Sequence, residues 1–141
     1  MTELSSDTIH ASCVAIDGRA VLLAGRSGVG KSDLALRLID RGATLVSDDY
    51  TQLVRRGDTL RAAPPGTIAG RIEVRGVGIV EMRHVADVAV ALLIELDAPL
   101  ARMPEFATRR LAGIDVPVAA LAPLEASAPL KIELLLAALP A

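Results

Sequence analysis

An octapeptide near the start of the chain restricts the fold more than any other feature. Its residues, which fit the pattern G-x-x-x-x-G-K-[S/T], are Gly25, Arg26, Ser27, Gly28, Val29, Gly30, Lys31 and Ser32. Glycines let the backbone of such a loop curl, so that successive N–H groups point inward at phosphate oxygens, and a following helix adds its positive N-terminal end. In these loops the lysine reaches the β- and γ-phosphates and the hydroxyl ligates Mg²⁺. The octapeptide therefore predicts that all eight residues form a phosphate-binding site.

The segments on either side of the octapeptide have the pattern that such a loop requires. An apolar run at 20–24 predicts a strand, and apolar residues spaced by four after Gly30 predict a helix over about 31–41, with Gly42 as a left-handed C-terminal cap. Alternating residues at 9–16 predict an earlier strand, joined to 20–24 by an Asp17-Gly18 turn. A strand, a glycine-rich loop and a helix in this order favour an α/β fold.

The rest of the chain predicts more strands and one more helix. An apolar run at 88–96, interrupted only by Glu95, is typical of a central strand, whereas 97–115 predicts a loop with little regular structure. Glycines at 76 and 78 predict a bend within a strand-like stretch, 72–79. The closing helix is expected over about 128–139, with Ser127 as its N-cap. The other expected strands are 44–47, 51–54, 59–62 and 116–121, with a turn at 55–58 between the second and third of them.

Two adjacent carboxylates, Asp48 and Asp49, follow the expected strand at 44–47. The short helix and the Gly42 turn would return the chain beside the loop, so the pair can reach a metal or an attacking group. Because neighbouring side chains of an extended strand point in opposite directions, Asp48 and Asp49 are expected to have different roles. Glu73 is a candidate for a second metal-directed carboxylate, and His10 for a functional histidine. The pattern alone leaves open that both are ordinary solvated strand residues.

Composition excludes several classes of protein. Lys and Arg total 15 against 17 for Asp and Glu, and Tyr50 and Phe106 are the only aromatic residues, so neither a basic surface nor a stacking platform for nucleic acid is expected. The longest apolar run is far shorter than the roughly 18 residues of a membrane span. The polar N-terminus is unlike a secretory signal, so we expect a cytoplasmic protein that does not bind membranes. Cys13, the single cysteine, is expected to be a small buried residue.

The mean hydropathy of +0.46 is high for a small domain, whose many surface positions favour polar residues. We infer a buried subunit interface.

Four segments together resemble the catalytic domain of HPr kinase/phosphorylase. The resemblance covers the chain from His10 to about Ile79, and the last of the four is much more specific to that family than the glycine-rich loop. They are Ile9-His10-Ala11, Gly25 to Ser32, Leu45-Val46-Ser47-Asp48-Asp49 and Glu73-Val74-Arg75-Gly76-Val77-Gly78-Ile79. The resemblance implies an α/β P-loop kinase domain with a mixed β-sheet, related to phosphoenolpyruvate carboxykinase. We expect residues 1–141 to form one such domain, in the compact form that lacks the family's N-terminal domain.

The resemblance also implies an activity and its residues. Family members use ATP, and often pyrophosphate, to phosphorylate a serine of the small phosphocarrier HPr of the phosphotransferase system, and many remove that phosphate by phosphorolysis. Carried over, Asp49 would be the base that activates the serine, Lys31 would neutralise the phosphates and His10 would support the phosphate site. Ser32 and Glu73 would hold Mg²⁺, and we count Asp48 with them. The family's members are commonly hexameric, which agrees with the inferred interface.

The sequence departs from the family in its C-terminal part. The residue after the loop serine is Asp33, shorter than the usual acidic residue. The P-V-R-P-G-R segment associated with phosphorolysis has no counterpart after Val116-Pro117-Val118, so we do not expect phosphorylase activity. The family's catalytic arginine precedes that segment, and Arg109 and Arg110 are both candidates for it.

Three functions remain open from the sequence. The first is an ATP- and Mg²⁺-dependent protein-serine kinase acting on an HPr-like phosphocarrier. The second is a small-metabolite kinase, which shares the loop but needs no protein acceptor. The third is an ATP-responsive module that docks another regulator, such as a two-component system, without turnover.

Overall fold

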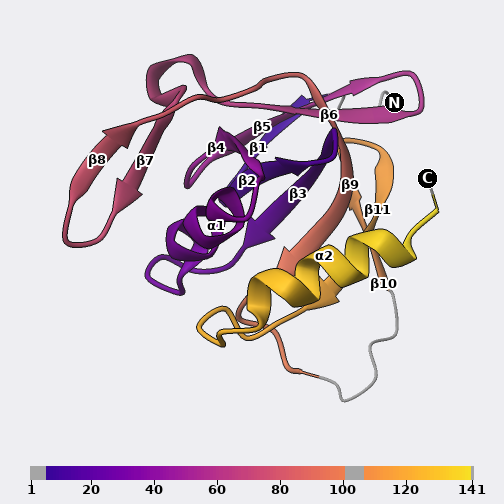
Figure 1. Cartoon of the computed structure of the whole chain (residues 1–141). Helices are drawn as coiled ribbons and strands as arrows, with labels where there is room; N and C mark the ends of the chain where they lie inside the picture. The colour runs from indigo at the N-terminus through magenta and orange to yellow at the C-terminus, as the bar shows by residue number, and fades with distance from the viewer. Residues whose placement is uncertain (1–5, 101–106, 141) are drawn as a thin grey trace.

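Three parallel strands form the centre of the computed structural model, which describes residues 6–100 and 107–140. They are β3 (Arg19–Ala24), β9 (Val88–Glu95) and β11 (Ile114–Ala120), with β9 between the other two (Figure 1). Leu92, Leu93 and Ile94 of β9 are fully buried. The prediction of a central strand at 88–96 is thus confirmed.

Two antiparallel strands extend the sheet beyond β3. β2 (Ala11–Ile16) pairs with β3 through the predicted turn, in which Asp17 and Gly18 have φ of +50° and +77°. Two residues of positive φ match the right-handed twist of a tight hairpin. β4 (Thr44–Ser47) then pairs with the other edge of β2. Because of these directions, the start of β2 lies beside the ends of β3 and β4.

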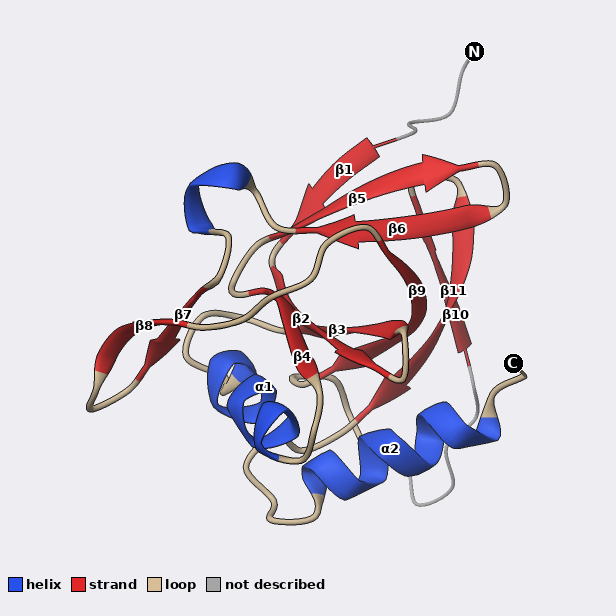
Figure 2. Ribbon diagram, turned by 45° about the horizontal axis from the view of Figure 1, so that its top comes forward, coloured by secondary structure: helices blue, strands red, loops and turns tan. Residues whose placement is uncertain are grey.

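A ribbon of three antiparallel strands curls the sheet over. β1 (Ser6–Ile9), β5 (Thr51–Arg56) and β6 (Thr59–Ala63) pair in that order, and β6 joins the start of β9 (Figure 2). The predicted strand at 9–16 is therefore wrong in its boundaries, because residues before and after His10 belong to different strands. Residues 6–9 pair with β5, whereas 11–16 pair with β3 and β4.

The two faces of the curled sheet bury two apolar clusters. One cluster lies under α1 (Lys31–Asp40) and α2 (Ala128–Ala138), which cover the same face in Figure 2. The second lies within the curl and includes Cys13, Leu53 and Leu93. Cys13 is fully buried, as expected, and burial raises the pKa of its thiol. None of the helices in the described residues has the length and apolar character needed to cross a membrane.

The predicted cap residues lie at the ends of both helices. Gly42, with φ of +111°, follows α1, and the N–H groups of Gly42 and Ala43 bond to the carbonyls of Ile39 and Leu38. This is the predicted left-handed C-terminal cap. Ser127 occupies the N-cap position of α2, as predicted, and its carbonyl accepts the first helical hydrogen bond, from Lys131 N–H, although its side chain makes no cap hydrogen bond.

The stretch at 72–79 is a hairpin instead of one bent strand. β7 (Arg71–Val74) and β8 (Gly78–Glu81) form a separate two-stranded sheet that extends from the body past α1 (Figure 1). Gly76 and Gly78 have φ of +84° and +112°, so the chain reverses where a bend was predicted. A short 3₁₀ helix, η1 (Gly66–Ile68), precedes the hairpin.

The prediction of an irregular 97–115 segment is wrong for 107–115. β10 (Ala107–Leu111) pairs with β11 through a two-residue turn, Ala112-Gly113, whose φ angles are both positive. Alanine is not typical of the first position of such a turn, so the sequence pattern did not predict the hairpin. The rest of the predicted loop includes 101–106, which lie outside the described residues. Arg109 and Arg110 therefore lie on a strand that is separated from β3 by β11 and β9, and Arg110 Nη1 is 3.2 Å from Asp115 Oδ1.

Candidate functional site

The loops that surround the candidate site all leave one edge of the sheet. The glycine-rich loop follows β3, Asp97 follows β9 and the segment at 122–125 follows β11. Because these strands are parallel, their carboxyl ends meet at the same edge, where ligands bind in open α/β sheets. The antiparallel strand β2 begins at this edge and β4 ends there, so His10 and Asp48 arrive beside the loop.

The glycine-rich loop has the backbone geometry that its sequence predicts. Gly28 and Gly30 have φ of +81° and +115°, values that side-chain-bearing residues rarely adopt. A Cβ on Gly25 would lie 2.8 Å from Cγ1 of Val29, which leaves no room for a larger residue. α1 begins directly at Lys31. The strand, loop and helix are therefore arranged to present N–H groups to an anion.

Lys31 is held at the loop. Its side chain is largely buried, and Nζ donates hydrogen bonds of 2.8 Å and 3.0 Å to the carbonyl oxygens of Gly25 and Arg26. The backbone N–H of Arg26 donates to Asp97 Oδ2 at 2.9 Å, while the Arg26 side chain is 72% exposed. Sequence reasoning missed Asp97, although its place after the central strand was a usable signal.

Ser32 and Asp48 meet beside the loop. Ser32 Oγ donates to Asp48 Oδ1 at 2.6 Å. Asp48 is only 7% exposed, and it also accepts hydrogen bonds from the Ser12 hydroxyl at 2.9 Å and from the Glu73 N–H at 3.0 Å. A loop hydroxyl paired with a carboxylate is the oxygen-donor set that holds Mg²⁺ in P-loop enzymes. The residues therefore fit that ion.

Glu73 joins this group through its backbone, while its side chain is exposed. Within residues 6–100 and 107–140, no three His, Cys, Asp or Glu side chains gather as a metal site. Mg²⁺ commonly takes one or two protein carboxylates and fills its remaining positions with water and substrate phosphates. The donor set here suits an ion that arrives with a polyphosphate.

Asp49 faces a different environment from Asp48. Its carboxylate is 54% exposed, and Oδ1 lies 2.8 Å from Nε2 of His10. The His10 ring stacks on Tyr50, with centroids 5.0 Å apart and planes at 22°. Asp48 is thus directed into the loop and Asp49 toward solvent beside a histidine. The expected difference between them is present, but it arises from a turn after β4, where Asp49 has a φ of +68°, and not from strand alternation.

A hollow of about 560 Å³ adjoins the outer side of the loop. Its walls include Val29 of the loop, Leu96 after β9, and Pro123 and Leu124 after β11. Arg37 of α1 holds this last segment in place, because its guanidinium donates to the carbonyls of Pro123 and Glu125. The hollow has mostly apolar walls, with Arg26 and Glu125 also in its lining, and it lies next to the phosphate-binding loop, an arrangement that suits the base of a nucleotide.

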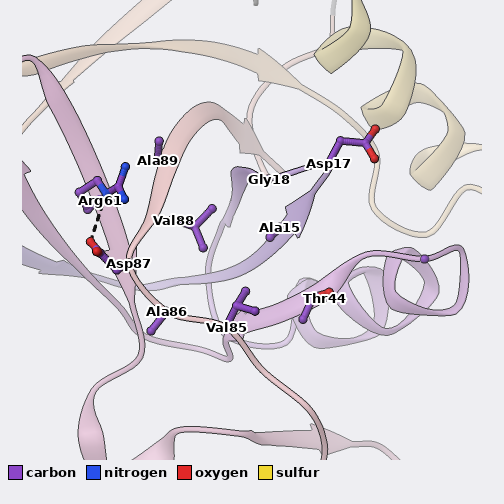
Figure 3. A pocket seen from close by; sticks show the side chains of 11 residues that line it. Ala15, Asp17, Gly18, Thr44, Arg61, Val85, Ala86, Asp87, Val88 and Ala89 are labelled. Atoms are coloured by element: carbon purple, nitrogen blue, oxygen red, sulfur yellow. Dashed lines mark hydrogen bonds and ion pairs between the residues drawn. The ribbon is translucent and has the colours of Figure 1, made fainter.

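A second hollow, of about 420 Å³, lies at the other end of β3, beside the Asp17-Gly18 turn (Figure 3). Arg61 Nε contacts Asp87 Oδ1 there at 3.1 Å, and this hydrogen bond lowers the pKa of the Asp87 carboxyl. No residue of the glycine-rich loop lines it. Arg61 and Asp87 are paired with each other. Because no loop residue lines this hollow, it is separate from the candidate site.

Replacing Asp48 by asparagine should destabilise the protein. Three donors converge on the carboxylate, and an amide NH₂ in place of Oδ2 would face the Glu73 N–H with no acceptor. A buried donor left unpaired costs about 1–3 kcal/mol, so the free energy of unfolding in urea should fall by that amount. Asp58→Asn, at an exposed position in the β5–β6 turn, is the matched control. Equal urea midpoints for the two variants would contradict the expectation.

Comparisons with known proteins identify relatives of this chain. Residues 2–98 match the family described as HPr Serine kinase C-terminal domain. The HPr kinase/phosphorylase of Caldanaerobacter subterraneus subsp. tengcongensis is 44% identical over 77 residues, which are 54% of this chain and 25% of the relative. That of Chlorobium luteolum is 36% identical over 124 residues, covering 77% of this chain and 37% of the relative. The chain thus spans well under half the length of these two relatives.

A solved structure, the Hpr(Ser) kinase/phosphatase from Coxiella burnetii, matches the fold with a TM-score of 0.82 and 34% sequence identity. The match covers 93% of this chain and 94% of that one. The curled mixed sheet with its P-loop, predicted as an α/β P-loop kinase domain, is therefore shared with a structure of that name.

Proposed function

Because the chain belongs to the HPr Serine kinase C-terminal domain family, we propose that it transfers the γ-phosphoryl group of ATP to a serine of an HPr-like phosphocarrier. One observation carries the proposal: the Asp49–His10 pair lies beside the Ser32–Asp48 pair at the mouth of a phosphate-binding loop. Phosphoryl transfer to a hydroxyl needs this combination of an anion cradle, a metal-binding oxygen set and a base.

The loop and Lys31 bind the donor in this proposal. The backbone N–H groups of 25–32 surround the phosphates, and the Lys31 ammonium moves its hydrogen bonds from two loop carbonyls to phosphate oxygens. Mg²⁺, when bound, neutralises charge on the β- and γ-phosphates. Ser32 and Asp48 would hold the ion, with Glu73 as a third candidate. The apolar hollow beside Val29 would receive the adenine.

Asp49 acts as the general base. As the serine oxygen forms its bond to the γ-phosphorus, the bond from that phosphorus to the bridging oxygen of the departing ADP breaks, and the serine proton passes to the Asp49 carboxylate. The exposure of Asp49 lets a protein serine approach it. His10 holds the carboxylate in place through its contact with Oδ1. We propose the kinase direction only, since no P-V-R-P-G-R segment is present.

The test is phosphate transfer from γ-labelled ATP to a purified HPr-like protein. We expect label on serine that depends on added Mg²⁺ and disappears with EDTA and with Asp49→Asn. Label in a small molecule without a protein acceptor would instead indicate a metabolite kinase. Nucleotide-dependent binding to a two-component regulator without label would indicate a sensor. Either of these last two results would overturn the proposed reaction.

We further propose that the protein acts in the cytoplasm as a homo-oligomer, a hexamer being the family's common form. Large apolar side chains that are exposed in the single chain support this: Val77, Ile79, Leu124, Leu130 and Leu134. Light scattering at several concentrations should give a mass that is a multiple of 14.7 kDa. A constant monomer mass would contradict it.

A further inference from the structure

The hydroxyl of Ser12 joins the two halves of the candidate site. Ser12 lies near the start of β2 and is fully buried. Its Oγ donates to Asp48 Oδ1 at 2.9 Å and accepts a hydrogen bond from the backbone N–H of Asp49 at 3.0 Å. A hydroxyl has one proton and two lone pairs, so these contacts use its donor and one acceptor site.

Asp49 has a backbone conformation that needs such support. Its φ is +68°, in the left-handed region that residues with side chains rarely adopt. Residues in this region persist when their surroundings hold them there. The Asp49 side chain, being 54% exposed, is only partly held by packing. The bond from its N–H to Ser12 anchors the main chain at this turn.

Contacts run continuously from the phosphate-binding loop to the candidate base. Ser32 bonds to Asp48, Asp48 to Ser12, Ser12 to the Asp49 backbone, and the Asp49 carboxylate to His10. Ser12 is the member of this series that touches both acidic residues. Removing its hydroxyl would therefore leave the position of the Asp49 carboxylate less firmly fixed relative to the Asp48 carboxylate.

We propose that Ser12 is a positioning residue, whose hydroxyl fixes Asp49 relative to Asp48 so that the base meets the reacting serine beside the γ-phosphate. This inference rests on the proposed function. A displacement of the base by about 1 Å can lower the rate by roughly 10²-fold, because proton transfer and in-line attack both need alignment. The hydrogen bonds of the Ser12 hydroxyl go to Asp48 and Asp49 and not to the glycine-rich loop or Lys31, so its effect should be larger on turnover than on nucleotide binding.

The variant Ser12→Ala tests this in the full chain. We expect kcat to fall by about 10–100-fold, with KM for Mg·ATP within about twofold of wild type, because the loop and Lys31 are unchanged. Thr51→Val is the matched control. The Thr51 hydroxyl is also fully buried and donates to a β2 carbonyl, that of Ala11, at 2.8 Å, but in this structure it bonds to neither acidic residue. Thr51→Val should keep kcat within about twofold. A Ser12→Ala variant with unchanged kcat, or a Thr51→Val variant with an equal loss, would overturn the proposal.

Amide hydrogen exchange separates this inference from the proposed function. In wild type the Asp49 N–H should exchange slowly, and in Ser12→Ala at least about 10-fold faster, since its acceptor is gone. If wild type transfers no phosphate to a carrier, the proposed reaction fails and exchange alone decides the positioning role. Faster exchange at Asp49 in Ser12→Ala would then support it, and equal rates in both proteins would refute it.

Discussion

The Asp49→Asn variant is expected to transfer phosphate with a kcat about 10²–10⁴-fold below wild type, the usual contribution of a general base. Asparagine has nearly the same size, and its amide can still hydrogen-bond to His10, so the geometry of the turn should survive. What is lost is the capacity to accept the serine proton. The binding of Mg·ATP should be unchanged, because the hydrogen bonds of Asp49 go to His10 and Ser12 and not to the loop or Ser32.

Kinetics and calorimetry on the same samples check this expectation. Steady-state rates with an HPr-like acceptor give kcat, and titration with Mg·ATP gives the affinity. Asp58→Asn, which makes the same chemical change at an exposed turn, should behave as wild type. If Asp49→Asn kept more than about a tenth of the wild-type kcat, the assignment of the base would be wrong, since base removal costs at least about 10²-fold.

Lys31→Met should lower kcat by about 10²–10³-fold, the effect of removing one donor that stabilises developing transition-state charge. Methionine has a side chain of similar length, so the largely buried space remains filled while the charge disappears. The carbonyls of Gly25 and Arg26 lose their partner, and the proposed phosphate site loses the charge of the ammonium group. Nucleotide affinity should fall as well, because the ammonium binds phosphate in the ground state too.

The chain contains a natural control for this substitution. Lys131 on α2 is the only other lysine, and it forms an ion pair with Glu125 at 2.7 Å on the surface. Surface ion pairs contribute little, about 0–1 kcal/mol, so Lys131→Met should retain full activity and near-normal stability. Similar losses in the two lysine variants would show that the effect is general and that Lys31 has no special role.

Much of the fold could be predicted because local patterns report local structure. The helix after Gly30, its Gly42 cap and the strand at 44–47 depend on residues close together in the sequence. The failures have other causes. The break at His10 arises because 6–9 and 11–16 pair with different strands, and pairing between distant segments leaves no periodic signal in either one. The β10–β11 hairpin was missed for a local reason, because Ala112 is not a residue typical of its two-residue turn.

The site shows the same division. The glycine-rich loop and the carboxylates after β4 are visible as motifs. The contacts of Ser12 and Asp97 are not visible as motifs, because their hydrogen bonds join residues far apart in the chain. Arg109 and Arg110 were candidates by position, and the structure places both on β10, which is separated from β3 by β11 and β9.

The sequence by itself determined that a backbone cradle for phosphates would sit between a strand and a helix, since glycines and a helix start are local requirements. It also determined which acidic residues, Asp48 and Asp49, would stand near that cradle. Only the tertiary structure decided where the two carboxylates lie and which side chains they contact. Strand pairing brought Ser12 and His10 to the ends of β3 and β4, so that Asp48 is held against Ser32 while Asp49 faces outward beside a histidine.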